Sequence, residues 1–258
     1  MSTILKTKKV IGVIPARMAS TRFHGKPLVK ILGKEMLQWV YEYCQPSKTL
    51  KEVYVATDHE DIENFCKKEN IPCVMTSPAH KNCSERSNEV CQRMKADYVV
   101  EIQGDEPTLL TSDIDDFVTQ AFQFKEFDVV TQYTDITSQQ AEDPHNVKIV
   151  LGPEHKALFF SRCPMPCNFK NKPTAKYYKQ VGLFLWKAES ANRFVHTPVS
   201  YLESIEDTHM LRMVENNFDI RLVYTPKYTV GVDVPGDVKE AEEFLLARKQ
   251  TVLTNNKG

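Results

Sequence analysis

Short apolar runs alternate with amphipathic stretches through the first half of the chain. Strands are expected at residues 10–14, 53–56, 71–75 and 98–102, with helices between them at residues 36–44, 61–68 and 84–95. Ser84 is the expected N-cap of the last of these helices. Strands that alternate with helices in this way are typical of a parallel sheet covered by helices on both faces. The pattern therefore predicts an α/β fold with a doubly wound, mostly parallel sheet.

The alternation is less regular in the second half of the chain. Helices are expected at residues 113–124, 188–194, 204–217 and 238–249, and strands at residues 128–131, 147–150, 181–184, 220–224 and 229–232. Residues 163–180 contain three prolines and many lysines, which is typical of an exposed arm or loop rather than of a core element. We expect a single domain over residues 1–258, with this arm protruding from it.

Composition and charge narrow the possible partners. Lysine and arginine number 33 against 34 aspartates and glutamates, so the formal charge is -1 and there is no global field to attract nucleic acid or an anionic membrane. The chain has 7 cysteines without a CxxC pair, which favours free thiols in a reduced cytoplasm. The first apolar run ends at Pro15, too short for a signal peptide, and no uncharged apolar stretch is long enough to span a membrane, so we expect neither a secretory nor a membrane-spanning segment. We therefore expect a cytoplasmic protein in which any binding of phosphate is local.

One candidate site follows the strand at residues 98–102 directly. Gln103, Gly104, Asp105, Glu106 and Pro107 stand where the strand gives way to a loop, which is where open α/β sheets bind ligands. A carboxylate in this place suits a magnesium ion that carries polyphosphate. The alternative is a polar turn, since Gly and Asp are ordinary turn residues.

A second candidate site is the basic loop at residues 15–27, after the first strand. It supplies Arg17, Arg22 and Lys26 together with the hydroxyl of Ser20, a set suited to binding a triphosphate. The loop is not a P-loop, because Lys26 is followed by proline instead of Ser or Thr. A solvated connection remains the alternative.

Asp233 also follows a predicted strand. It either lies across the site from Asp105 and completes a magnesium site, or caps the helix that begins near Pro235. Two other patterns have simpler explanations: His80 and Cys83 lack the further ligands of a zinc site, and the Asp113/Asp115 pair lies at a helix start.

Taken together, these motifs resemble the 3-deoxy-manno-octulosonate cytidylyltransferases, also called CMP-KDO synthetases. The resemblance covers about residues 10–243. It rests on motifs that appear in order at residues 15–28, 55–58, 85–86, 103–107, 146–150, 160–162, 202–212 and 231–233.

The resemblance implies a nucleotidyltransferase, Rossmann-like fold and the transfer of CMP from CTP to an acidic eight-carbon sugar, with release of pyrophosphate. Such a reaction serves cell-surface polysaccharide synthesis, as in lipopolysaccharide biosynthesis. It also implies a homodimer, to whose interface the arm could contribute. The site residues that it implies are Pro15, Ala16, Arg17, Ser20, Arg22, Lys26 and Gln103 for the nucleotide, with catalytic roles for Arg17, Lys26 and Asp105, Mg²⁺ on Asp105 and Asp233, and the sugar acid near Arg86, Arg162, Gln180, Glu203 and Glu206.

Two departures from the family lie on the acceptor side. Gln180 stands where the family typically has histidine, and Phe184 stands where it has tyrosine. The nucleotide side is thus retained more fully than the acceptor side, which suggests an acceptor that is not standard KDO. The acceptor expected is a 3-deoxy-ulosonic acid or a close acidic relative, with KDO or an amino-substituted KDO as the first candidates. Two alternatives remain: activation of another small acid, such as a phosphonate, and a non-catalytic homologue that only binds nucleotide.

Overall fold

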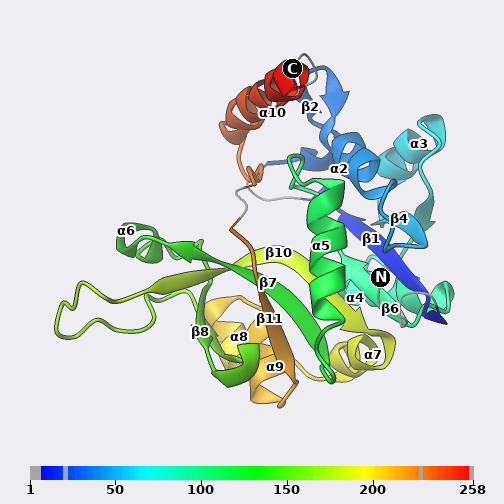
Figure 1. Ribbon diagram of the computed structural model, residues 1–258. Helices are drawn as coiled ribbons and strands as arrows, with labels where there is room; N and C mark the ends of the chain where they lie inside the picture. Colours follow the sequence, from blue (N-terminus) through cyan, green and yellow to red (C-terminus); the bar gives the residue numbers. More distant parts are fainter. Residues whose placement is uncertain (1–6, 20–22, 227–228, 256–258) are drawn as a thin grey trace.

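A nine-stranded sheet with helices on both faces forms the centre of the computed structural model, which describes residues 7–19, 23–226 and 229–255 (Figure 1). The strands of this sheet are β1 (Val10–Ala16), β4 (Glu52–Thr57), β5 (Cys73–Met75), β6 (Tyr98–Glu101), β7 (Val129–Ile136), β8 (Lys148–Leu151), β9 (Ala157–Ser161), β10 (Tyr177–Lys187) and β11 (Ile220–Tyr224). Two short strands, β2 (Lys30–Ile31) and β3 (Lys34–Glu35), pair with each other in a separate sheet. The helices are η1 (Lys26–Leu28), α2 (Met36–Cys44), α3 (Glu60–Lys68), α4 (Cys83–Arg93), α5 (Thr111–Ala121), α6 (Ser138–Ala141), η2 (Pro153–His155), α7 (Ala188–His196), α8 (Tyr201–Glu206), α9 (Met210–Glu215) and α10 (Asp237–Asn255).

The sheet has the strand order β11-β7-β10-β6-β1-β4-β5. β1 pairs in parallel with β4 and β6, β4 with β5, and β7 with β11. The long strand β10 is antiparallel to both β6 and β7, and β8 and β9 attach beside it. The predicted α/β fold with a mostly parallel sheet is confirmed.

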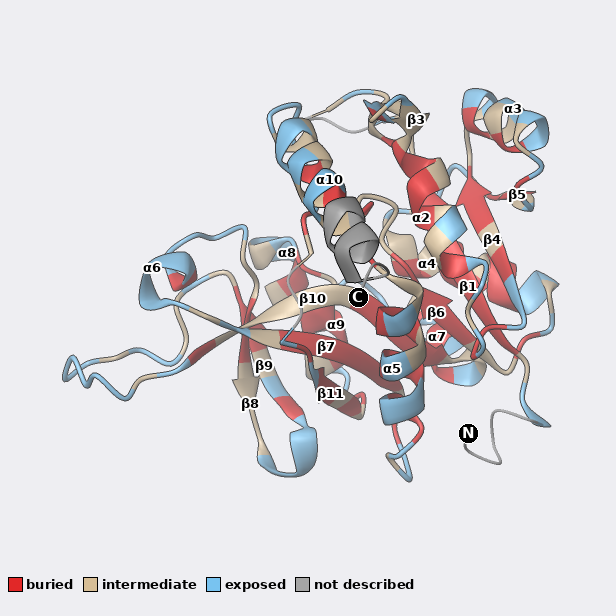
Figure 2. Ribbon diagram, turned by 45° about the horizontal axis from the view of Figure 1, so that its top comes forward, coloured by how far each residue is buried: buried red, intermediate tan, exposed pale blue. Residues whose placement is uncertain are grey.

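Apolar side chains form two buried clusters, one on each side of this sheet. The central strands and the helix faces toward them are coloured as buried in Figure 2. One layer contains Leu37 of α2 and Phe117 of α5, and the opposite layer contains Val90 of α4 and Phe194 of α7. Strand β1 lies between the two layers, and all seven of its residues are buried. A strand buried on both faces has no polar side to alternate with, which explains the continuous apolar run that marks it in the sequence.

Three local predictions are wrong. The helix expected over residues 204–217 is two helices, α8 and α9, because the chain turns at Asp207 with a left-handed φ of 47°. Residues 229–232 form no strand; the backbone N–H of Val232 donates instead to the carbonyl of Asp105 at 2.9 Å. The N-cap of α4 is Asn82, whose side chain accepts from the N–H of Glu85, while Ser84 is buried as the second residue of the helix.

The segment between β9 and β10, residues 162–176, extends away from the sheet as a long loop (Figure 1). The exposed arm predicted over residues 163–180 is therefore shorter, because residues 177–180 belong to β10 and pair with β7. It exposes Phe169, which is 87% accessible. All seven cysteines are free thiols. Within the described part of the chain, no helix combines the length and the apolar character needed to cross a membrane.

Candidate active site

The carboxyl ends of two neighbouring strands bring the two candidate loops together. β1 and β6 are adjacent and parallel, with Val13 opposite Glu101, so the loops that follow them leave the same edge of the sheet. Gly104 lies against the first loop: a Cβ atom there would come within 3.0 Å of the carbonyl oxygen of Pro15. The absence of a side chain at Gly104 therefore allows the backbone that carries Asp105 to approach the basic loop closely.

Lys26 joins two carboxylates that are far apart in sequence. Its Nζ lies 2.6 Å from Oδ2 of Asp105 and 3.3 Å from Oδ1 of Asp233. Burial alone would lower the pKa of Lys26, but the charges of Asp105 and Asp233 and their hydrogen bonds raise it above its ordinary value. Lys26 is thus held as an ammonium group, with its side chain only 14% exposed.

The two aspartates also fit a divalent cation. They already converge on one positive charge, and magnesium is usually held by one or two carboxylates together with phosphate oxygens and water. The described residues contain no cluster of three or more His, Cys, Asp and Glu side chains that would hold a metal alone. The two aspartates are therefore suited to a cation that arrives bound to a polyphosphate. They are too few to form a structural metal site in which the protein supplies every ligand.

The structure describes only some of the other residues predicted for the nucleotide side. Pro15 and Ala16 are buried at the end of β1, and Arg17 donates to the backbone carbonyls of His80 and Lys81, the latter at 3.3 Å. Ser20 and Arg22 lie outside the described residues.

Gln103 is held by a buried carboxyl that the sequence reasoning missed. Its Nε2 donates to Oε1 of Glu101 at 3.1 Å, and Oε2 of Glu101 accepts from the hydroxyl of Ser84 at 2.8 Å. Burial raises the pKa of Glu101 to about 7, against the effect of these two hydrogen bonds. The available signal was a glutamate in an otherwise apolar strand.

A cavity of about 800 Å³ opens beside Gln103. Its lining includes Gln103, Glu106, Lys179, Gln180 and Asp233. Through Asp233 the cavity adjoins the group formed by Lys26, Asp105 and Asp233, called the Lys26 cluster below.

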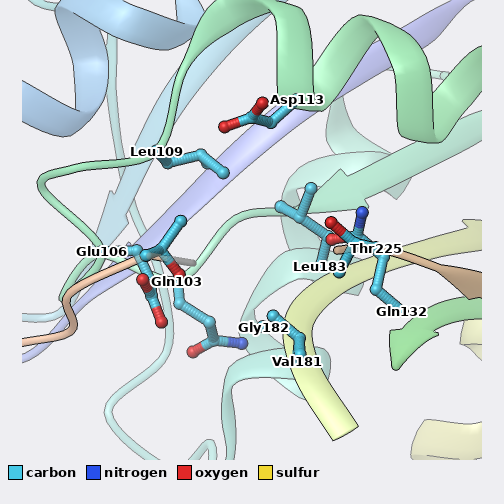
Figure 3. Close-up of a pocket in the computed structure, with 10 residues that line it drawn as sticks. Gln103, Glu106, Leu109, Asp113, Gln132, Val181, Gly182, Leu183 and Thr225 are labelled. Atoms are coloured by element: carbon cyan, nitrogen blue, oxygen red, sulfur yellow. The ribbon is translucent and has the colours of Figure 1, made fainter. Parts of the chain in front are cut away.

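Gly182 gives Gln103 and Glu106 room to lie side by side at the cavity. Both also line a smaller pocket, in which they lie next to Gly182 (Figure 3). A Cβ at Gly182 would be 3.1 Å from Cγ of Gln103. Burial raises the pKa of Glu106 to about 7, the charge of Asp105 adds to this rise, and the charge of Lys179 opposes it.

Only some of the residues predicted to contact the sugar acid line the cavity. Arg162 and Gln180 line the cavity. Glu203 is buried against Arg212, with N···O distances of 2.6 and 2.7 Å, and Glu206 accepts from the hydroxyl of Ser161 at 3.1 Å. The last two carboxylates therefore have partners within the fold.

Arg86 has no exposed surface at all. Its guanidinium donates to Oδ2 of Asp58 at 2.5 Å and to the hydroxyl of Thr76. The environment of Arg86 is that of a structural ion pair, because no part of the side chain reaches the cavity or solvent.

The arrangement has the features of an enzyme that transfers a nucleotide. Lys26 lies in the loop after β1 and Asp105 in the loop after the neighbouring parallel strand β6, while Asp233 reaches Lys26 from a segment that forms no strand. A large polar cavity adjoins this group of residues. Together with the comparisons below, the fold and this site define a nucleotidyltransferase.

Sequence comparisons identify the family. A family model described as cytidylyltransferase matches residues 11–220. The 3-deoxy-manno-octulosonate cytidylyltransferase of Bacteroides thetaiotaomicron is 38% identical over 251 residues, covering 93% of this chain and 99% of that one. The enzyme of the same name from Lawsonia intracellularis is 37% identical over 244 residues, covering 93% and 96% of the two chains.

A solved structure supports the same family assignment. A CMP:2-keto-3-deoxy-manno-octonic acid synthetase complexed with CTP superposes with a TM-score of 0.87 at 32% identity, covering 93% of this chain and 99% of that one. The chain therefore belongs to the cytidylyltransferase family, and within it to the CMP-KDO synthetases.

Proposed function

We propose that this protein transfers CMP from CTP to KDO or an amino-substituted KDO and releases pyrophosphate. The observation that carries the proposal is the meeting of Lys26, Asp105 and Asp233 beside a polar cavity of about 800 Å³. The relatives of that name, which match the chain over nearly its whole length, support the choice of substrates. The product would serve the synthesis of a cell-surface polysaccharide such as lipopolysaccharide.

On the nucleotide side, Arg17 and Lys26 bind the triphosphate, and Gln103 contacts the nucleotide. Attack of the acceptor hydroxyl on the α-phosphorus builds negative charge on the equatorial and leaving oxygens, and fixed cations stabilise that charge. The ammonium of Lys26 is already oriented by two carboxylates, so it needs little reorganisation to act in this way. Pro15 and Ala16 place this loop at the strand end.

Asp105 and Asp233 would hold a divalent cation, which we propose to be Mg²⁺. CTP-dependent nucleotidyltransferases generally need such an ion. When bound, it neutralises charge on the phosphate oxygens and acts as a Lewis acid. The contribution of the chain is to keep two carboxylates on one side of the triphosphate site, fixed by the hydrogen bond between Val232 and the backbone of Asp105.

On the acceptor side, Gln180 favours a ligand that donates hydrogen bonds. Its Nε2 donates to the hydroxyl of Thr131 at 3.2 Å and to the carbonyl of Val181 at 2.6 Å. The carbonyl oxygen of its amide is then the group that accepts from the acceptor sugar. A hydroxyl or an amine supplies that hydrogen, which keeps both KDO and an amino-substituted KDO as candidates.

Purified protein is to be incubated with CTP and Mg²⁺ and with each of four acceptors: KDO, an amino-substituted KDO, a sialic-type acid and a phosphonate. We expect pyrophosphate release with at least one ulosonic acid. Release with the phosphonate alone would replace the proposal by activation of another small acid. CTP binding in a calorimeter without magnesium dependence, together with no turnover of any acid, would indicate a non-catalytic homologue.

We further propose a single catalytic domain that forms a homodimer, with residues 163–180 near the interface. Light scattering coupled to size exclusion, applied to the full chain and to a variant with residues 166–173 replaced by a short Gly-Ser linker, tests this assembly. A monomeric wild-type protein would refute it.

A further inference from the structure

The basic side chains around the acceptor cavity differ in how far the fold already uses them. Arg162 donates from Nε to the carbonyl of Glu206 at 2.5 Å, and from its two other nitrogens to the carbonyls of Pro144 and Asp207 at 2.9 and 2.8 Å. Every nitrogen of this guanidinium thus holds a backbone turn in place. Burial lowers the pKa of His209 to about 4, so its imidazole is neutral at physiological pH.

Lys179 is different, because no described residue forms an ion pair with it, although its charge acts on the buried carboxyl of Glu106 and opposes the rise in the pKa of that group. It lies half-buried on β10 and lines the cavity. Its Nζ donates to Oδ1 of Asn146 at 3.3 Å, and none of the ion pairs formed by the described residues includes it. By contrast, Lys187 on the same strand is paired with Glu126 at 3.2 Å. An ammonium has three donors, so Lys179 retains capacity for a ligand.

The surroundings of Lys179 also hold its partner in a fixed orientation. Asn146 donates through Nδ2 to the carbonyl of Gln140 at 2.9 Å, which directs its Oδ1 toward Lys179. Both Gln140 and Asn146 line the same cavity. A half-buried cation that is oriented by a neutral amide is costly to leave without an anion, and an acidic ligand in the cavity would supply one.

We propose that Lys179 binds the carboxylate of the acceptor acid. This inference rests on the proposed function, and it moves acid recognition away from Arg86, which is buried against Asp58. Lys179 then acts as a specificity residue: it selects an acidic acceptor, while the Lys26 cluster selects the triphosphate.

The test compares Lys179→Met and Lys179→Arg with Lys187→Met as a matched control. Lys187 is on the same strand but opposite Tyr98, at the end remote from Lys179. We expect Lys179→Met to raise KM for the ulosonic acid about 10- to 100-fold, with KM for CTP within about twofold of wild type. Lys179→Arg should restore most of the acid affinity, and Lys187→Met should behave as wild type. An unchanged KM for the acid in Lys179→Met would overturn the proposal.

The methyl ester of the acid separates carboxylate binding from a structural role. Wild type should lose affinity for the ester about as much as Lys179→Met loses affinity for the acid, and the variant should hardly distinguish acid from ester. Equal loss toward acid and ester in the variant would mean that Lys179 supports β10 or balances Glu106, and would overturn the proposal.

Calorimetry keeps this inference separate from the proposed function. The acid is titrated into wild type and Lys179→Met, each loaded with a non-hydrolysable CTP analogue. Binding to wild type alone, without turnover of any acid, would refute the proposed function and support the role of Lys179. Equal binding to both proteins would refute the role of Lys179 alone, and no binding to either would refute both.

Discussion

Replacement of Arg86 by methionine is expected to destabilise the protein without selectively weakening binding of the acceptor acid. The guanidinium is 0% exposed and lies 2.5 Å from Oδ2 of Asp58, whose side chain is 21% exposed. Arg86 also donates to the hydroxyl of Thr76. The variant therefore leaves the Asp58 carboxylate without its ion-pair partner and removes one donor from the Thr76 hydroxyl, which still donates to the carbonyl of Thr57 at 3.0 Å.

The size of the effect follows from the burial of the two partners. Breaking a buried ion pair by removing one member costs about 3–5 kcal/mol. Asp58 keeps some contact with water, and Nε of Arg86 has no hydrogen-bond partner in the native state, so the loss of stability should fall at or below the lower limit of this range, at about 2–3 kcal/mol. For a chain of this size, about 2–4 °C per kcal/mol gives a fall in Tm of about 4–12 °C.

The assay is thermal and urea unfolding followed by circular dichroism, for Arg86→Met, Asp58→Asn and the double variant. If the pair is structural, the double variant should be less destabilised than the sum of the single variants. Kinetics are measured well below Tm, where KM for the acid should stay within about threefold of wild type. A Tm within 1 °C of wild type, combined with about a tenfold or larger rise in that KM, would show that Arg86 contacts the substrate and that the structural argument is wrong.

Three other substitutions test the site. Asp105→Asn should lower turnover by more than about 100-fold with an unchanged circular dichroism spectrum, and full activity would mean that the metal site is misplaced. Because the pKa of Glu101 is raised to about 7 from 4.5, the folded protein holds this proton while the unfolded chain releases it, so wild-type stability falls as pH rises through this window. Urea unfolding at pH 5 and pH 8 should show that the free energy of unfolding of wild type falls by up to about 3 kcal/mol more than that of Glu101→Gln. The same change with pH in both proteins would contradict this. Gly182→Ala should displace Gln103, which lies 3.1 Å from the added methyl group, and raise both substrates' KM; unaltered kinetics would show that the Gln103 side chain can move away freely.

Much of the fold was predictable from local pattern. The buried strand β1 and the helix α2 appear in the sequence as a continuous apolar run and as a helical period, since burial on two faces or on one face leaves a direct trace in residue order. The failures have local causes that periodicity does not contain. Asp207 breaks the helix predicted over residues 204–217 with a left-handed turn, although the apolar spacing continues through it.

The sequence alone also placed Asp105 and Lys26 at strand ends, because a polar residue that follows a buried strand marks the edge where ligands bind. It could not decide the role of Asp233, which is separated from Lys26 by 207 positions and reaches it only through folding. Nor could it show that Arg86 is enclosed and paired, while Lys179, within a segment predicted to be an exposed arm, lines the cavity and forms no ion pair with any described residue. Residue type and order determine which chemistry is possible along the chain. Burial and long-range pairing decide which of those groups meet a substrate, and both arise only when distant segments pack.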